Sequence, residues 1–416
     1  MALIRKATSS SFANMPNDGS CALVVATFIG LCIVTPASGQ RGAPAPNLAI
    51  DDGRQWFEPG AEASAGSAVR KGALATAFNE GTAEKILLGV IRASPRSEEA
   101  SQAHELLSRI YLRSGQYNRA LENLDRWAES FPNRREVLSE RADIEQFRGL
   151  PDQHNGPVRG STLSHEADDW SLPVSIDGMP ASYLFDSGAW ISVMSDAEAM
   201  RLGLAIRSGS GTIGDSSGTG FRARTAVARE VRLGAMRFQN VSFAVVTNKE
   251  PFGILGMPIW AAVRHVRWSN RGTWELGGPS ASADRASRNV VFSGNHLLLA
   301  TSVSGTRVFG NLDTGAIDTD LNANFSEQFP ALIQQGTKET RAITGLGGTA
   351  SFDSVTVPEV PFLIGPTRVV LRPAHVAFQR NGGTGGACCV GNIGLDILAQ
   401  TGGFELDLSA MALRLQ

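Results

Sequence analysis

Two short stretches of the chain carry the same pattern, an apolar run followed by an aspartate, a small hydroxyl residue and a glycine. The first is YLFDSGAW at 183–190, and the second is FGNLDTGA at 309–316. One such tripeptide arises by chance in roughly one chain in five of this length. A pair with matching apolar flanks therefore indicates an internal duplication, which constrains the fold more than any other feature of the sequence.

The region around the two motifs has the pattern of β-strands. From about residue 157 onward, short apolar alternations are separated by Gly, Asn, Asp and Ser, as in TAVAREVRLGAMRFQNVSFAVV at 225–246. The polar segment GPSASADRASRN at 278–289 divides this region into halves of similar size, each with one motif. We expect two β lobes, at 157–278 and 290–416.

In each lobe a second apolar strand ending in glycine follows the motif, within FGILGMPIW at 252–260 and CVGNIGLDIL at 389–398. This layout resembles that of pepsin-like and retroviral-type aspartic proteases over residues 160–416. The resemblance implies a mainly β, bilobal acid-protease-like β-barrel fold. It also implies that the apolar-apolar-glycine strand, at 254–256 and at 392–394, packs beside the catalytic turn.

The two motif aspartates, Asp186 and Asp313, have the chemistry that this family uses. Hydrolysis of a peptide bond by two carboxylates requires that they share one proton, so that one activates a water and the other donates to the carbonyl oxygen. Since two like charges at that range resist joint ionisation, such a dyad titrates as a coupled unit. We predict that Asp186 and Asp313 are the catalytic pair, and because one chain carries both, a monomer suffices.

The neighbouring motif residues are suited to support such a dyad. Gly188 and Gly315 allow backbone amides to approach the carboxylates, and Ser187 and Thr314 can hydrogen-bond across the lobe interface. The next residue in both motifs is alanine, as in the retroviral type, whereas many pepsins have a hydroxyl residue there. Without that extra hydrogen bond the charged carboxylates are less favoured, so we expect activity at weakly acidic to neutral pH.

Two glycine-rich stretches match the substrate-covering hairpins of this family, GSGTIGDSSGTG at 209–220 and ITGLGGTASF at 343–352. Such a cover excludes water and strengthens the electrostatics of the dyad. The tyrosines of the chain lie outside both stretches, so the flap tyrosine of pepsins is absent and the resemblance is closer to the retroviral type. The residues expected to bind substrate are Ile213, Gly214, Gly345, Leu346 and Gly347.

The first of these stretches also matches two unrelated motifs, G-x-G-x-x-G at 209–214 and G-x-S-x-G at 214–218. Both motifs require a helix next, whereas 221–234 has the pattern of a strand. We therefore expect neither a dinucleotide site nor a serine nucleophile. Asp318 and Asp320, which follow the second motif closely, are interpreted as solvated turn carboxylates.

Residues 67–150 have helical periodicity and resemble a tetratricopeptide region of two to three helical hairpins. Gly115 is expected at a turn, Ala120 at the close approach of two helices, and Pro132 at a helix end. Both an ordinary helical-hairpin domain and a groove that binds a peptide or protein partner remain open. The matching positions are Leu107, Tyr111, Gly115, Tyr117, Ala120, Leu124, Trp127 and Pro132.

The first 39 residues, 1–39, have the features of a signal peptide: Arg5 and Lys6 precede the apolar run ALVVATFIGLCIV at 22–34, and small residues follow. A run of about 13 apolar residues is short for a membrane span, which needs roughly 20. We expect export, with a periplasmic location; an uncleaved membrane anchor at 22–34 is the alternative. Residues 40–66, rich in Pro, Ala, Gly and Asp, are expected to form a flexible linker.

The composition limits the partners and cofactors that the chain can take. A net charge of -2, with no Lys/Arg run interleaved with aromatics, argues against nucleic acid as a partner. The histidines show no metal-ligand spacing, and two adjacent thiols make no zinc site, so we expect no metal or other cofactor. Cys388 and Cys389 are interpreted as small, semi-buried residues.

The motifs, their strands and the hairpins together favour an exported aspartic endopeptidase that hydrolyses peptide or protein substrates with a water activated by Asp186 and Asp313. The alternative is a catalytically silent, protease-like protein. Such a protein would bind peptides or act as a scaffold, and would use its helical repeats to recruit a partner.

Overall fold

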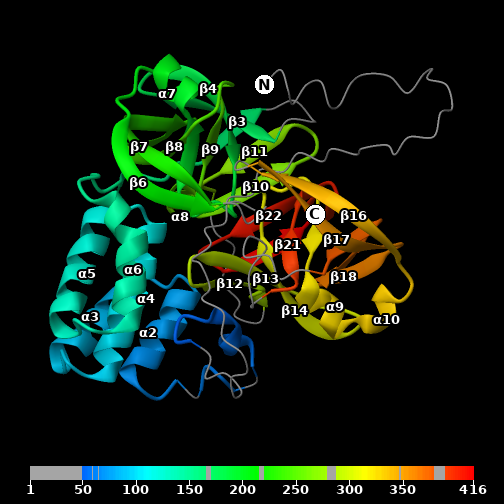
Figure 1. Cartoon of the computed structure of the whole chain (residues 1–416), viewed down its shortest axis with the longest axis horizontal. Coiled ribbons are helices and arrows are strands. Elements are labelled where there is room, and N and C mark those ends of the chain that lie inside the picture. The colour runs from blue at the N-terminus through cyan, green and yellow to red at the C-terminus, as the bar shows by residue number, and fades with distance from the viewer. Residues whose placement is uncertain are drawn as a thin grey trace.

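The computed structural model describes residues 49–58, 60–63, 65–164, 170–214, 220–278, 287–345, 348–378 and 389–416. Helices are concentrated in the N-terminal part and strands make up most of the rest, so the expected mainly β fold class with a preceding helical region is confirmed (Figure 1). The expected signal peptide and residues 40–48 of the expected linker lie outside the described residues. The described part of that linker includes η1 (Gly53–Phe57), in which Trp56 is buried. Within the described ranges, every helix is too short or too polar to span a bilayer.

Local sequence signals fix the ends of the helices in the N-terminal region. Ser97 caps α4 by accepting a hydrogen bond from the amide of Ala100, and Gly115, at φ +69°, makes the turn between α4 and α5. Ala120 is fully buried where these two helices pack. The elements are η1 (Gly53–Phe57), α2 (Ala68–Ala77), α3 (Ala83–Ala93), α4 (Glu98–Arg113), α5 (Tyr117–Ser130), α6 (Arg135–Ile144) and η2 (Glu145–Phe147). Their assignment to the tetratricopeptide type stays a prediction.

The first β lobe is an eight-stranded sheet that closes on itself, because β8 pairs with both β5 and β7. Alternation along β3 explains its orientation: Leu172, Val174 and Ile176 face the core. The strands are β1 (His154–Asn155), β3 (Ser171–Ile176), β4 (Met179–Phe185), β5 (Ser192–Ser195), β6 (Arg207–Gly214), β7 (Gly220–Leu233), β8 (Met236–Val246) and β9 (Gly253–Leu255). Two short helices, α7 (Asp196–Arg201) and α8 (Met257–Val263), complete the lobe.

The second β lobe is built on a ten-stranded sheet with an equivalent centre. Its strands are β12 (Val290–Ser293), β13 (His296–Val303), β14 (Thr306–Leu312), β15 (Asp320–Leu321), β16 (Thr337–Gly345), β17 (Gly348–Val357), β18 (Val360–Ile364), β19 (Thr367–Leu371), β20 (Ala374–Ala377) and β21 (Gly391–Ile393). The helices α9 (Ala323–Gln328), α10 (Pro330–Ile333) and α11 (Leu395–Leu398) lie in the same lobe.

The internal duplication is visible in three strands of each lobe. In the first lobe β4 runs parallel to β9, and β9 is antiparallel to β5. In the second lobe β14 runs parallel to β21, and β21 is antiparallel to β15. Each motif aspartate follows the last residue of the first of these strands, so the repeated sequence corresponds to a repeated arrangement of strands.

A third sheet joins the two lobes, which the sequence did not indicate. It has the order β2 (Ser161–Ser164), β11 (Thr273–Leu276), β10 (His265–Ser269), β22 (Gly403–Asp407) and β23 (Ala412–Leu415). The first three strands come from the first half of the β region and the last two from the end of the chain. Stacking of Trp268 on Phe404, with centroids 6.1 Å apart, fills the interior where the halves meet.

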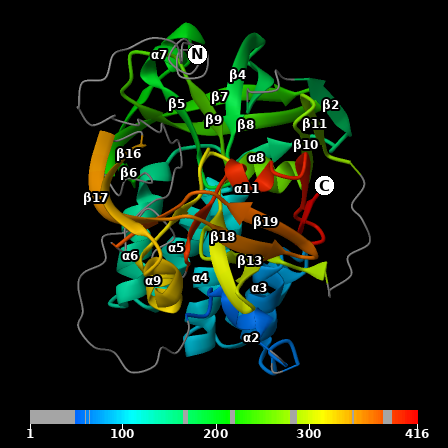
Figure 2. The same cartoon turned by 90° about the vertical axis from the view of Figure 1, so that its right-hand side faces the viewer.

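The helical region packs against both lobes rather than standing apart (Figure 1 and Figure 2). The amide of Gln153, in the segment that leads into the first lobe, donates to the carbonyl of Gly115 at 3.0 Å. On the other side, the Asn79 side-chain amide donates to the carbonyl of Leu408 at 3.2 Å. These contacts place the helices beside the junction between the lobes.

Candidate active site

The structure brings Asp186 and Asp313 together at the interface between the lobes. The Asp186 amide donates to the carbonyl of Leu255 at 3.0 Å, and the Asp313 amide donates to the carbonyl of Ile393 at 3.1 Å, which fixes both turns to the neighbouring strand. A Cβ added to Gly188 would lie 2.7 Å from Cγ of Asp313. The turn of one lobe therefore lies directly against the carboxyl group of the other, and only glycine leaves enough room.

Backbone amides cradle one oxygen of each carboxyl group. Oδ1 of Asp186 accepts hydrogen bonds from the amides of Gly188 (2.7 Å) and Ala189 (3.1 Å). Oδ1 of Asp313 accepts equivalent bonds from Gly315 (3.0 Å) and the following alanine (3.1 Å). Amide donors favour the charged form of a carboxyl group, so they oppose the effect of burial.

The two motif hydroxyl residues form a reciprocal set of hydrogen bonds across the interface. The Ser187 amide donates to Oγ1 of Thr314 at 3.0 Å, and the Thr314 amide donates to Oγ of Ser187 at 3.1 Å. Each hydroxyl then donates to a carbonyl of the opposite lobe, Ser187 to Leu312 at 2.8 Å and Thr314 to Phe185 at 2.7 Å. Both side chains are buried, so these four bonds hold the two motif turns in one geometry.

The second oxygens of the two carboxyl groups have different surroundings. Oδ2 of Asp313 accepts a hydrogen bond from Nδ2 of Asn392 at 3.0 Å, and Oδ1 of Asn392 accepts one from Nδ2 of Asn311 at 3.2 Å. Oδ2 of Asp186 is buried and accepts no hydrogen bond from a donor among the described residues. The strand register explains the difference, because Ile254 holds in β9 the position that Asn392 holds in β21.

The pKa values of the two carboxyl groups are shifted to different extents. Burial, followed by the charge of Asp313, raises the pKa of Asp186 well above its ordinary value. Burial also raises the pKa of Asp313, but the Gly315 amide, a hydrogen bond from Asp186 and the next backbone amide act in the opposite direction. These shifts favour a protonated Asp186 beside a charged Asp313. The sequence signal that could have revealed the hydrogen bond from Asn392 to Asp313 is the asparagine in GNIG at 391–394, where the first lobe has GILG at 253–256.

Further acids surround the second turn, and one of them corrects an expectation. Asp320 is buried rather than solvated: its carboxylate lies 3.1 Å from Arg341, and burial raises its pKa to about 7. Asp318 is more exposed and lies 3.9 Å from the same arginine. Asp396, whose pKa burial raises to about 6, accepts a hydrogen bond from Oγ1 of Thr319 at 2.6 Å.

Both glycine-rich stretches form antiparallel hairpins. In β6 and β7, Ile213 pairs with Phe221 and Gly214 with Gly220; in β16 and β17, Gly345 pairs with Gly348. The tips, 215–219 and 346–347, lie outside the described residues, so Leu346 and Gly347 are not placed. Since β7 is a strand, neither the dinucleotide fingerprint nor the nucleophile elbow has the helix that it requires.

The end of the helical region contacts the first catalytic turn, which the sequence did not indicate. Trp190 follows the DSGA motif, and its ring centroid lies 5.3 Å from that of Phe147 at an interplanar angle of 83°. Phe147 in turn stacks on Tyr117 of α5 at 4.7 Å. Nearby, Nη1 of Arg207, at the start of β6, donates to the carbonyl of Gly149 at 2.5 Å. The helices therefore support both the turn and the base of one hairpin.

Residues 172–259 match the family model described as aspartyl protease. The matched stretch contains Asp186, Ser187, Gly188 and the strand that ends at Gly256, and it supports an aspartic protease. No match was found among the curated proteins. Among solved structures, a retropepsin-like aspartic protease from Rickettsia conorii is similar at 15% identity over 30% of this chain and 93% of its own, with a TM-score of 0.23.

Among the described residues, Cys389 is the one cysteine, and it lies just before β21 (Gly391–Ile393). Cys389 is buried rather than semi-buried, and it is disulfide-bonded. Cys388 lies outside the described residues. The described residues contain no group of three or more His, Cys, Asp or Glu side chains placed to hold a metal ion.

Proposed function

We propose that the protein is an aspartic endopeptidase in which Asp186 and Asp313 form the catalytic dyad. The single observation that carries the proposal is the juxtaposition of two buried carboxyl groups, each held by its own pair of backbone amides. Oδ2 of Asp313 accepts a hydrogen bond from the Asn392 side chain, whereas Oδ2 of Asp186 has no donor among the described residues. Burial with a like charge is the arrangement that keeps one proton between two acids near neutral pH.

The asymmetry assigns a role to each acid. The Asp313 carboxylate accepts a proton from a water while the water oxygen bonds to the carbonyl carbon of the scissile peptide. Asp186 donates its proton to the carbonyl oxygen, which leaves a neutral gem-diol. When the intermediate collapses, Asp313 returns its proton to the leaving nitrogen and Asp186 recovers one from a diol hydroxyl, so that the dyad is regenerated.

Access to the dyad requires a conformational opening, because both carboxyl groups are inaccessible to solvent. We assign this movement to the hairpins β6–β7 and β16–β17, whose glycine-rich ends tolerate backbone change. On this proposal Ile213, Gly214 and Gly345, with Leu346 and Gly347, contact the peptide. Closure over a bound substrate excludes water from the reaction.

The wider proposals follow from the sequence. The chain supplies both halves of the dyad, so we propose a catalytically complete monomer acting on peptide or protein substrates, with the helical region available to recruit a protein partner. The N-terminal segment supports export, with a periplasmic location. Tagging the full-length chain and fractionating the cells tests the location: recovery of the shortened protein in the cytosol would contradict export.

A cleavage assay tests the activity directly. The purified chain is incubated with denatured casein and with a peptide library, with and without pepstatin, across a wide pH range. Asp186→Asn and Asp313→Asn should abolish turnover, whereas Asp318→Asn, a more exposed acid near the second motif, should retain it. Equal turnover by Asp313→Asn would remove the dyad from the mechanism, and no turnover by the parent would favour a silent peptide-binding protein.

A further inference from the structure

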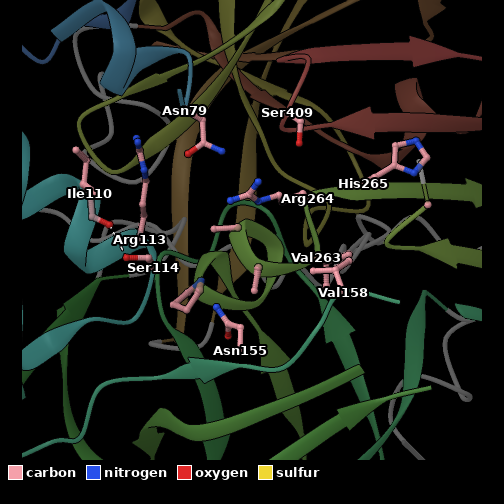
Figure 3. A pocket seen from close by; sticks show the side chains of 14 residues that line it. Asn79, Ile110, Arg113, Ser114, Asn155, Val158, Val263, Arg264, His265 and Ser409 are labelled. Atoms are coloured by element: carbon pink, nitrogen blue, oxygen red, sulfur yellow. Dashed lines mark hydrogen bonds between the residues drawn. The ribbon is translucent and has the colours of Figure 1, made fainter. Parts of the chain in front are cut away.

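A cavity of about 460 Å³ lies where the helical region meets the lobes, and its lining does not include the dyad. Its walls come from the end of α4, from α8 and from the first residues of β10, with Ser409 contributed by the end of the chain (Figure 3). Cavities of this size hold small molecules. Neither the proposed chemistry nor the predicted partners make use of it.

Arg113, at the end of α4, is the most unusual side chain of this cavity. Only 5% of its surface is exposed. Nη2 donates to the carbonyl of Thr76 at 2.9 Å, and the guanidinium lies over the Phe292 ring at 4.2 Å, but Nη1 is buried without a hydrogen-bond partner among the described residues. Burial lowers the pKa of Arg113 to about 9, with no acid to offset it. A buried, unpaired guanidinium is costly unless an anion approaches it.

The remaining polar groups that line the cavity are cationic or neutral. Arg264 borders the cavity and forms no ion pair among the described residues. Nε2 of His265 lies 3.1 Å from Oε1 of Glu405, and its Nδ1 is buried with no hydrogen-bond partner in the part of the chain that the structure describes. Asn79, Asn155 and Ser409 supply neutral polar groups, and no aspartate or glutamate lines the described walls. Figure 3 shows Arg113, Arg264 and Asn79 around the same space. The charged lining is therefore positive.

The other walls are apolar. Ile110 and Pro258 line the cavity, together with Val158 and Val263. A ligand that satisfies the arginines must also present hydrocarbon to these side chains, because an inorganic ion would leave their surface against water. The cavity thus selects for an anionic head on an apolar body.

We propose that this cavity binds a small organic oxyanion, a carboxylate or a phosphate monoester on an apolar body, with the Arg264 guanidinium as its anchor and the buried Arg113 guanidinium as a second positive charge. Both head groups present paired oxygens to a guanidinium fork. Binding requires no peptide cleavage, so the proposal stands or falls independently of the protease assignment.

The test is ligand binding to the full chain by isothermal titration calorimetry and thermal unfolding. The probes are hexanoate, hexyl phosphate, hexanol and hexylammonium at matched ionic strength. Hexanoate, hexyl phosphate or both should bind and raise the melting temperature, and the better of the two identifies the head group. Hexanol and hexylammonium should not bind. Absence of binding by both anions, or equal binding of hexanol, would overturn the proposal.

Arginine variants distinguish binding in this cavity from nonspecific attraction of the anion to charges on the protein surface. Arg113→Met should weaken anion binding roughly tenfold, because it removes one of the two positive charges beside the cavity. The same variant should unfold at a higher temperature than the parent without ligand, because it removes an unpaired buried charge. Arg264→Met should also weaken binding, whereas Arg267→Met, a half-exposed residue of β10 outside the cavity, should bind as the parent does. Unchanged affinity in Arg113→Met would overturn the proposal.

Discussion

Replacing Asn392 by leucine should move the acid limb of the pH-rate profile upward. Leucine has a similar volume but cannot donate to Oδ2 of Asp313, the bond that measures 3.0 Å. A hydrogen bond to a charged group contributes about 1.5–3 kcal/mol. Since one pKa unit corresponds to about 1.4 kcal/mol, the pKa of Asp313 should rise by about one to two units.

The sign follows from the form of the dyad that reacts. Losing a donor favours neutral Asp313, so the reactive state, with Asp186 protonated and Asp313 charged, appears only at higher pH. At pH values on the acid limb, kcat/KM of the variant should be roughly ten- to hundredfold lower than that of the parent. At higher pH the two enzymes should have similar kcat/KM. The assay is kcat/KM against pH with a fluorogenic peptide chosen from the library, alongside thermal unfolding of both proteins. A folded variant whose acid limb stays in place would refute the assigned asymmetry.

Three further changes test other parts of the account. Thr314→Ala leaves the Ser187 amide without its partner, so the free energy of unfolding should fall by about 1–3 kcal/mol per buried unpaired group, while Thr314→Ser stays near the parent in chemical denaturation. Gly188→Ala places a methyl group 2.7 Å from the Asp313 carboxyl, so kcat should fall roughly a hundredfold; Gly89→Ala, where the space is open, is the control, and full activity of Gly188→Ala would contradict the geometry. Burial, and then the charge of Asp51, raises the pKa of Glu105 to about 7. The stability that the neutral Glu105 carboxyl group contributes is therefore lost as pH rises from about 4.5 toward 7. Glu105→Gln should therefore raise the melting temperature, relative to the parent, more at pH 8 than at pH 5. A smaller increase at pH 8 than at pH 5 would contradict this.

Much of the β architecture could be predicted because its signals are local. The motif aspartates, the strands that follow them and the glycine-rich hairpins each occupy a few consecutive residues with clear periodicity and turn chemistry. Duplication added a second copy of each signal, so the fold class did not depend on any one of them. The same reasoning placed a helical turn at Gly115, where φ is positive.

The features that the sequence did not reveal depend on register and on packing between distant segments. The role of Asn392 follows from its pairing with Asn311, which alternation alone does not specify. The sheet shared by the lobes requires β10 to pair with β22, strands far apart in the chain. The burial of Arg113 likewise results from a packing arrangement between the helices and the lobes. Periodicity predicts which face of an element is apolar, but not which partner will cover it.

The central claim is that Asp186 and Asp313 act on one substrate group with one proton between them. A crystal structure of the full chain with pepstatin tests this most directly, because the central hydroxyl of the inhibitor occupies the position of the attacking water. We predict that this hydroxyl lies about 2.5–3.2 Å from carboxyl oxygens of both aspartates, beneath the hairpins β6–β7 and β16–β17. An inhibitor bound elsewhere, or carboxyl groups that face separate cavities, would contradict it.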